Sequence, residues 1–135
     1  DLAESPLFEG AEALVRELNG DYLLGVATGK SRRGLDRAFD ETGLRDCFHA
    51  SRCADEAHSK PHPQMLLDVM ELLGAEPART LMVGDTEYDM AMARSAGVTG
   101  LGVSYGVHHP ERLAATGAVD CLNDIRELRE WLQRG

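Results

Sequence analysis

Residues 80–103 read TLMVGDTEYDMAMARSAGVTGLGV, and the order of apolar runs and turns in these residues indicates the fold class. Residues 80–83 form a short apolar run, which predicts a buried strand. Residues 88–96 predict a helix that Gly97 ends, and residues 98–103 predict a second buried strand. Two apolar strands joined through a helix are typical of a parallel sheet that helices cover on both faces.

The same alternation continues on both sides of this stretch, so we expect one α/β domain over residues 1–135. Residues 22–27 read YLLGVA, a nearly continuous apolar run that predicts another buried strand. We therefore predict a three-layer sandwich whose functional loops lie at the carboxyl ends of parallel strands. The remaining predicted elements are helices over residues 6–18, 31–42, 65–73 and 125–132, a small helix after Pro110, and strands over residues 48–51 and 119–122. Ser31 is expected to cap the second of these helices, and Gly43 and Gly74 are expected to end the second and the third.

The composition limits the kind of ligand and the location. The chain has 23 acidic and 14 basic residues, and its formal net charge of −9 would repel a nucleic-acid backbone. We therefore expect a small molecule as the ligand and no nucleic acid. Cys47, Cys53 and Cys121 are widely spaced, which suggests neither a disulfide framework nor a zinc site. No apolar run reaches the length of a membrane span, so we expect a cytoplasmic protein.

Two carboxylates, Asp85 and Asp89, follow the predicted strand at residues 80–83. Asp85 would lie at the carboxyl end of this strand and Asp89 in the first turn of the next helix, so both could face one hard cation. The pair is therefore a candidate magnesium site. The alternative is that Asp85 or Thr86 caps the helix and that Asp89 interacts favourably with the helix dipole.

Two further loops could bind a phosphate. Residues 26–31 read VATGKS, in which a strand ends at a hydroxyl, a glycine and the amides of a helix start. A nucleotide-binding P-loop is rejected because that motif needs glycine five residues before Gly29, where this chain has Leu24. In residues 59–63, SKPHP, a proline restricts the backbone of Lys60, whose ammonium could offset phosphoryl charge. The alternative for Lys60 is a solvated surface lysine.

Three motifs together resemble those of haloacid dehalogenase-type hydrolases in order and spacing. They are TGK at residues 28–30, KP at residues 60–61 and GDTEYDM at residues 84–90, and they are similar to the second, third and fourth motifs of that family. Residues 96–132 resemble the end of phosphoglycolate phosphatase-like members. The resemblance spans almost the whole chain from Pro6, and it implies a haloacid dehalogenase-like, Rossmann-like core that hydrolyses a phosphate monoester with Mg²⁺.

The resemblance also implies a role for each matching residue. Thr28 would donate its hydroxyl to the substrate phosphate beside the Gly29 amide, and Lys60 would steady the nucleophile and the phosphoryl charge. Asp85 would bind Mg²⁺, and Asp89 would support the metal through water or outer contacts. In this family an aspartate of an Asp-x-Asp motif attacks phosphorus to form an aspartyl-phosphate, which water then hydrolyses.

The sequence departs from the family in one respect. The family carries Asp-x-Asp at the end of its first strand, and no Asp-x-Asp occurs upstream of Thr28. We therefore expect an inactive piece of such a phosphatase, without the first strand and most of the cap, in which residues 1–6 are a remnant of the cap's return linker. Loss of a central strand would leave open sheet edges, which favour marginal stability or a homodimer formed by strand exchange.

Two other functions remain open. The chain could be a non-catalytic domain that binds phosphate or a partner protein, although the retained Asp85 would then have no obvious use. A receiver-like signalling domain fits less well, because Asp85 lies next to the helix-borne Asp89 and follows the lysine. His108 and His109 receive no role, since paired histidines in a polar loop are mostly solvated.

Overall fold

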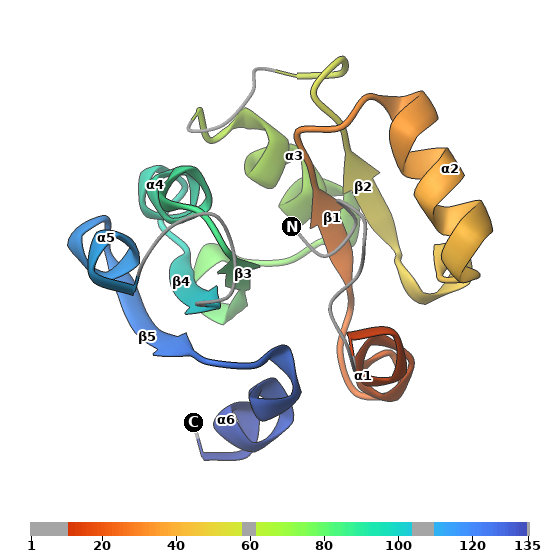
Figure 1. The fold of residues 1–135 in the computed structure, drawn as a ribbon. Coiled ribbons are helices and arrows are strands. Elements are labelled where there is room, and N and C mark those ends of the chain that lie inside the picture. Colours follow the sequence, from red (N-terminus) through yellow and green to blue (C-terminus); the bar gives the residue numbers. More distant parts are fainter. Residues whose placement is uncertain (1–10, 58–61, 104–109, 135) are drawn as a thin grey trace.

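The computed structural model describes residues 11–57, 62–103 and 110–134, in which helices and short strands alternate (Figure 1). The strands are β1 (Gly25–Ala27), β2 (Ala50–Arg52), β3 (Leu81–Gly84), β4 (Thr99–Val103) and β5 (Ala118–Leu122). The helices are α1 (Ala11–Leu18), α2 (Arg32–Thr42), α3 (Gln64–Leu73), α4 (Glu87–Ser95), α5 (Pro110–Ala115) and α6 (Leu128–Arg134). Single 3₁₀ turns lie at Arg45–Cys47, Pro77–Arg79 and Ile125–Glu127. All paired strands are parallel, which confirms the predicted α/β class.

The described strands form two sheets. One contains β1 and β2, and the other contains β3, β4 and β5 in that order. Among the described strands, no backbone ladder joins β1 to β3. Within the described residues each of these two strands is therefore an edge strand, in agreement with the expectation of open edges within the sheet.

β1 uses alternate backbone groups to pair on its β2 side. The Leu24 carbonyl accepts a hydrogen bond of 2.7 Å and the Thr28 amide donates one of 3.1 Å to the chain that enters and leaves β2. Because backbone groups alternate along a strand, the polar groups of Gly25 and Ala27 point away from β2. They lie on the edge where a further strand would pair.

Buried side chains join the two sheets. Ala27 of β1 and Met82 of β3 belong to one apolar cluster, which α3 and α4 cover with Met65 and Met92. Such a cluster replaces backbone hydrogen bonds as the link between β1 and β3, because it removes apolar surface of both strands from water. The integrity of the fold at this point therefore depends on side-chain packing.

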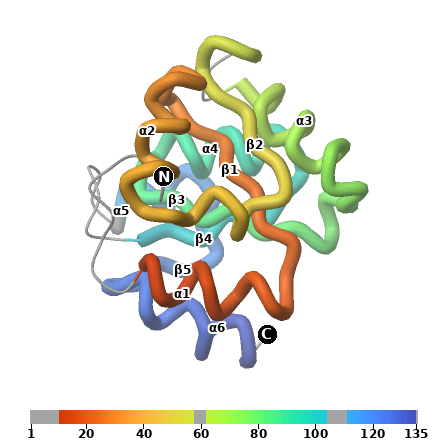
Figure 2. Tube along the Cα trace, turned by 90° about the vertical axis from the view of Figure 1, so that its right-hand side faces the viewer, coloured from red at the N-terminus to blue at the C-terminus, as the bar shows by residue number. Residues whose placement is uncertain are grey.

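α1 connects the two sheets from another side. Val15 packs with Val26 of β1, whereas Leu14 and Leu18 pack in the cluster that contains Leu101 of β4. α1 thus covers both sheets as one amphipathic helix. α1 and α6 lie side by side in both views, at one end of the molecule (Figure 2).

The helix ends follow the capping residues that the sequence predicts. Ser31 caps α2 because its Oγ accepts a hydrogen bond of 3.1 Å from the Gly34 amide. Gly43 and Gly74 end α2 and α3 with φ angles of 73° and 67°. Glycine suits these left-handed positions since it has no Cβ.

The strand predicted over residues 22–27 is shorter than expected. β1 begins at Gly25, and Tyr22 and Leu23 are 44% and 59% exposed. A turn after α1 takes up these residues, because the Tyr22 amide donates to the Leu18 carbonyl at 2.9 Å. The prediction of a buried strand was therefore wrong for the first half of this apolar run.

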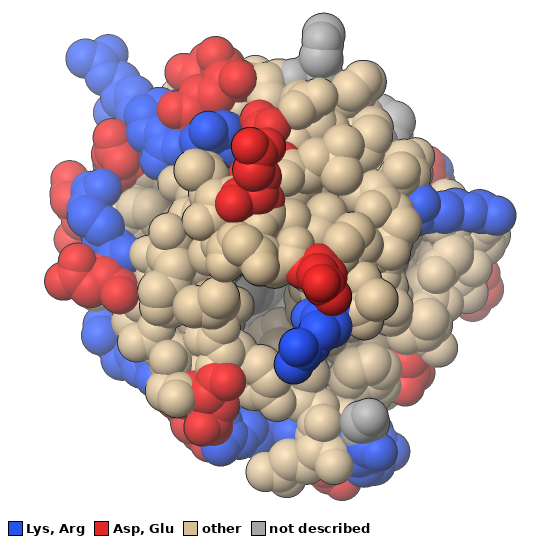
Figure 3. Space-filling view, turned by 180° about the vertical axis from the view of Figure 1, so that it is seen from behind, with Lys and Arg blue, Asp and Glu red and all other residues tan. Residues whose placement is uncertain are grey.

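Basic and acidic side chains lie next to one another on the surface. Arg45 bonds to Asp36 and Asp40, each at 3.0 Å, and the Arg126 guanidinium lowers the pKa of Asp124 to about 2. Figure 3 shows this mixture along the border of one face, together with a hollow near its centre.

In the described part of the chain, no helix is long and apolar enough to cross a lipid bilayer.

Candidate active site

α4 begins with a capping box made of two residues from the GDTEYDM motif. Thr86 Oγ1 accepts a hydrogen bond of 3.2 Å from the Asp89 amide, and Asp89 Oδ2 accepts one of 3.2 Å from the Thr86 amide. The Thr86 hydroxyl donates a further bond of 3.0 Å to the same carboxylate oxygen. Thr86 therefore caps the helix, as the alternative to metal binding proposed, and Asp89 completes the capping box from the first turn.

Asp85 and Asp89 differ in exposure. Asp89 is 0% exposed, whereas Asp85 is half-buried and follows the end of β3. A divalent cation could therefore reach the Asp85 carboxylate from solvent. In this conformation the buried Asp89 carboxylate could influence such a cation only indirectly. Since Mg²⁺ prefers carboxylate and water oxygens, Asp85 fits the direct ligand of the implied magnesium site and Asp89 fits an outer contact.

Gly84 permits the close approach of α4 to β3. A Cβ atom at this position would lie 2.3 Å from Asp89 Cβ and 2.6 Å from Asp89 Oδ2. Atoms in a packed interior cannot approach so closely, so any side chain here would displace Asp89. The glycine of the motif is thus explained by packing against the buried carboxylate.

Thr28 follows β1 and is fully buried. Its Oγ1 accepts a hydrogen bond of 3.1 Å from the Lys30 amide, which closes a tight turn around the exposed Gly29. A hydroxyl that accepts one bond can still donate its own hydrogen. Thr28 could therefore bind a phosphoryl oxygen once the atoms that cover it are displaced.

The two motifs follow the two strands that border the break in the sheet. Thr28 comes directly after β1, and Asp85 comes directly after β3. In α/β folds, ligands bind outside the carboxyl ends of the parallel strands. Lys60, His108 and His109 lie outside the described residues, so what the sequence predicts for them stays a prediction.

A contact that the sequence did not predict joins α4 to α5. Arg112 donates two hydrogen bonds, from Nε at 2.9 Å and Nη2 at 2.8 Å, to the two carboxylate oxygens of Glu87. Glu87 lies in the first turn of α4, between Asp85 and Asp89. Arg112 thus neutralises a third carboxylate close to the candidate cation site. No local sequence signal could reveal this pair, because its members come from different helices.

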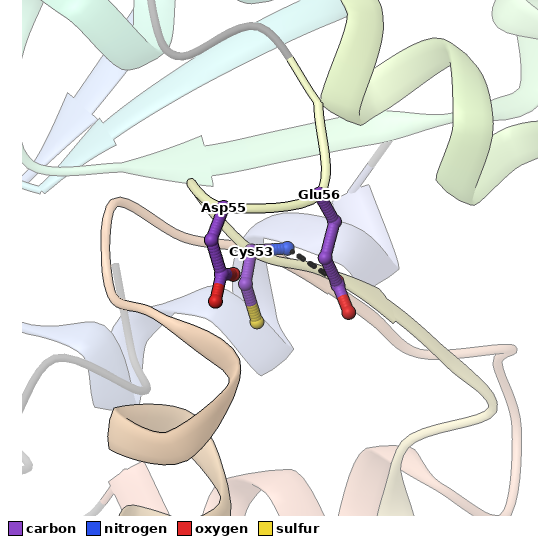
Figure 4. Close-up of side chains that lie close together, drawn as sticks. All are labelled: Cys53, Asp55 and Glu56. Atoms are coloured by element: carbon purple, nitrogen blue, oxygen red, sulfur yellow. Dashed lines mark hydrogen bonds between the residues drawn. The ribbon is translucent and has the colours of Figure 1, made fainter.

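Cys53, Asp55 and Glu56 form a second group of potential metal ligands, whose ligand atoms lie within 4.8 Å of one another (Figure 4). Arg32 already bonds to both carboxylate oxygens of Glu56, at 2.7 and 3.0 Å, and so neutralises the charge that would attract a cation. Burial raises the pKa of the Cys53 thiol to about 11, so thiolate is scarce at neutral pH. We conclude that this group is not a metal site. It connects the start of α2 to the segment after β2 through the ion pair between Arg32 and Glu56.

Cys53 should resist thiol reagents in the folded chain. At pH 8 we expect iodoacetamide to modify the half-buried Cys121 at least ~100-fold faster than the buried Cys53, because only thiolate reacts. Peptide mapping by mass spectrometry gives both rates. The urea-unfolded chain is the control, in which the two rates should agree within about threefold. Equal rates in the folded chain would contradict the buried, protonated state of Cys53.

Comparisons with known proteins agree with the three motifs. A family model of haloacid dehalogenase-like hydrolases matches residues 1–97. The phosphoglycolate phosphatase of Rhodospirillum rubrum is 35% identical over 133 residues, which are 97% of this chain and 55% of that protein. The pyrophosphatase PpaX of Bacillus mycoides is 34% identical over 129 residues, which are 94% of this chain and 60% of that protein. The chain thus spans little more than half the length of these relatives.

A solved structure shows the same arrangement of elements. The haloacid dehalogenase-superfamily hydrolase of subfamily IA from Geobacter sulfurreducens matches with a TM-score of 0.79 and 28% identity. The match covers 93% of this chain and 60% of that structure. Sequence motifs, family model and fold therefore agree, and the chain belongs to the haloacid dehalogenase-like hydrolase family.

Proposed function

We propose that this chain forms most of the catalytic core of a magnesium-dependent phosphate monoester hydrolase that resembles phosphoglycolate phosphatase. One observation carries the proposal: the phosphate motif at Thr28 and the carboxylate motif at Asp85 follow β1 and β3, which border the break between the two sheets. Hydroxyl and amide donors on one side of this break and a carboxylate on the other suit a phosphate group that is bound together with a cation.

Each described residue has a distinct task in this proposal. The Thr28 hydroxyl and the Gly29 amide donate hydrogen bonds to phosphoryl oxygens once the atoms that cover Thr28 have moved away, while the turn itself keeps its conformation. Asp85 holds Mg²⁺, which would supply positive charge to the phosphoryl group. Asp89 keeps the first turn of α4 in place through its bonds to Thr86, and thereby fixes the backbone that carries Asp85. Lys60 would add a second positive charge.

The nucleophile would come from a strand that is not among these 135 residues, since the chain contains no Asp-x-Asp. We place this strand between β1 and β3, where both neighbours are edge strands. Its first aspartate attacks phosphorus as the P–O bond to the alcohol breaks, and the second aspartate gives a proton to the leaving oxygen. Water then hydrolyses the aspartyl-phosphate and releases inorganic phosphate.

The substrate in this proposal is a small phosphorylated metabolite in the cytoplasm. The two relatives differ in what their names specify, phosphoglycolate in one and pyrophosphate in the other. Phosphoglycolate is our first choice because the phosphoglycolate phosphatase aligns with 97% of this chain. If no strand fills the break in the isolated chain, two copies could exchange strands at β1 and β3 and form a homodimer.

Replacing Asp85 by asparagine should remove divalent-cation binding, because the amide lacks the negative charge. Titration of the chain with Mn²⁺, followed by paramagnetic broadening of backbone NMR signals, should show broadening around residues 84–89. We expect the Asp85→Asn chain to need at least ~10-fold more Mn²⁺ for the same effect. Asp46→Asn, which removes an exposed carboxylate in the turn Arg45–Cys47, is the control and should behave as the wild type. Equal broadening in the Asp85→Asn chain would refute the proposed site.

A further inference from the structure

The side chain of Arg32 bonds at several points to β2 and to the segment that follows it. Its Nη1 donates to Ser51 Oγ at 2.8 Å and its Nη2 to the Ser51 carbonyl at 3.2 Å. Nε and Nη2 also donate to the two carboxylate oxygens of Glu56. In addition, the Arg32 amide donates to Asp55 Oδ1 at 3.1 Å. We call these contacts of Arg32 with Ser51, Asp55 and Glu56 the Arg32 clamp.

The Arg32 clamp lies next to the turn that carries the phosphate motif. The Thr28 amide donates to the Arg52 carbonyl at 3.1 Å, and the Ala54 amide donates to the Lys30 carbonyl at 2.9 Å. Together with the bond from the Lys30 amide to Thr28 Oγ1, these contacts tie both ends of the turn to one segment. The clamp continues this series two residues further along the chain, from Lys30 to Arg32.

The Arg32 clamp should be stronger than an ordinary surface ion pair. The side chains of Arg32 and Glu56 are 33% and 31% exposed, and their contact is bidentate. The bond to Arg32 also lowers the pKa of Glu56. By contrast, Arg45 and Asp40 are 49% and 76% exposed. A half-buried, bidentate pair is less screened by water and holds its geometry better than such an exposed pair.

We propose that Arg32 is a positioning residue, which holds the Thr28–Gly29–Lys30 turn in the conformation that binds a phosphoryl group by clamping the start of α2 to residues 51–56. The proposal rests on the proposed function for the identity of the ligand. The physical reason is that ordering a flexible turn costs free energy. When the amide and the hydroxyl are oriented before phosphate binds, less of the binding free energy is spent on ordering the turn. Arg32 itself makes no contact with the ligand in this account.

The test compares Arg32→Gln with the wild-type chain, and Arg45→Gln is the matched control. Arg45 contacts the same helix, α2, through Asp36 and Asp40, but at a distance in sequence from the turn. Amide hydrogen exchange by NMR reports on the turn, and titration with inorganic phosphate in the presence of Mg²⁺ reports on ligand affinity. Thermal unfolding of each chain separates local from global effects.

For Arg32→Gln we expect exchange at the amides of Thr28, Lys30 and Ala54 to become roughly 10-fold faster. The dissociation constant for phosphate should rise roughly 5-fold, since part of the binding energy must then order the turn. Arg45→Gln should change neither quantity. A double variant, Arg32→Glu with Glu56→Arg, should restore part of the protection, because it re-forms the ion pair with exchanged partners.

Three results would overturn the proposal. The first is unchanged exchange at these three amides in Arg32→Gln, and the second is equally faster exchange at all amides, which would indicate a role in global stability alone. The third is faster exchange in the turn with an unchanged phosphate affinity. If the wild-type chain binds no phosphate, the proposed function fails for this chain, whereas the exchange data still decide whether Arg32 holds the turn.

Discussion

Replacing Gly84 by alanine should lower the free energy of unfolding by about 2–4 kcal/mol, because the new methyl group overlaps Asp89 and disrupts the capping box of α4. The added Cβ would lie 2.3 Å from Asp89 Cβ and 2.6 Å from its Cγ, so α4 would have to move away from β3, which its pairing with β4 holds in place. The backbone that carries Asp85 would shift with the helix. We therefore also expect Mn²⁺ affinity to fall roughly 10-fold.

Urea unfolding followed by circular dichroism measures the effect, and Gly20→Ala is its control. A Cβ at Gly20 would have the Glu17 carbonyl oxygen at 3.7 Å, an ordinary contact, so this change should alter stability by less than about 0.5 kcal/mol. If Gly84→Ala is as stable as Gly20→Ala, the close packing of Asp89 against β3 does not describe the protein in solution.

Replacing Met65 by alanine should destabilise the chain by about 2–5 kcal/mol, the range for truncation of a fully buried large side chain. Met65 is 0% exposed and belongs to the cluster that contains Ala27 of β1 and Met82 of β3. Because no ladder joins β1 to β3 among the described strands, a cavity in this cluster weakens the link between the sheets directly. Amides of both strands should exchange faster than those of β4.

Leu67→Ala is the matched control, since Leu67 lies on the same helix and is 39% exposed. It should cost less than about 1 kcal/mol in the same urea titration. A similar loss for both variants, or faster exchange in β4 than in β1, would mean that this cluster does not join the two sheets.

Much of the fold could be predicted because the sequence contains strong local signals. Ser31, Gly43 and Gly74 cap helices as predicted, since capping depends on residues close in sequence. The apolar run at residues 22–27 misled the prediction, because apolar character alone does not distinguish a buried strand from the turn that exposes Tyr22. That distinction depends on where the preceding helix ends.

The candidate site was only partly predictable. The GDTEYDM motif identified Asp85 and Asp89 as candidate metal-site residues. Its spacing could not show whether Asp89 supports a metal ion or stabilises the first turn of α4, where it forms a capping box with Thr86. The pairs Arg112–Glu87 and Arg32–Glu56 join residues that are 25 and 24 positions apart. Such pairs form only when elements distant in sequence have packed, so no local pattern predicts them.

Mg²⁺-dependent hydrolysis of p-nitrophenyl phosphate should be measured for the chain with and without a peptide that carries the family's Asp-x-Asp strand. We predict turnover only when peptide and Mg²⁺ are both present, and its loss when the first aspartate of the peptide or Asp85 is replaced by asparagine. NMR shifts at Gly25 and Ala27, whose polar groups point away from β2, would show that the peptide binds at the break. Turnover by the chain alone, or a peptide that binds at β1 without producing any turnover, would contradict the claim that these residues form a phosphatase core completed by that strand.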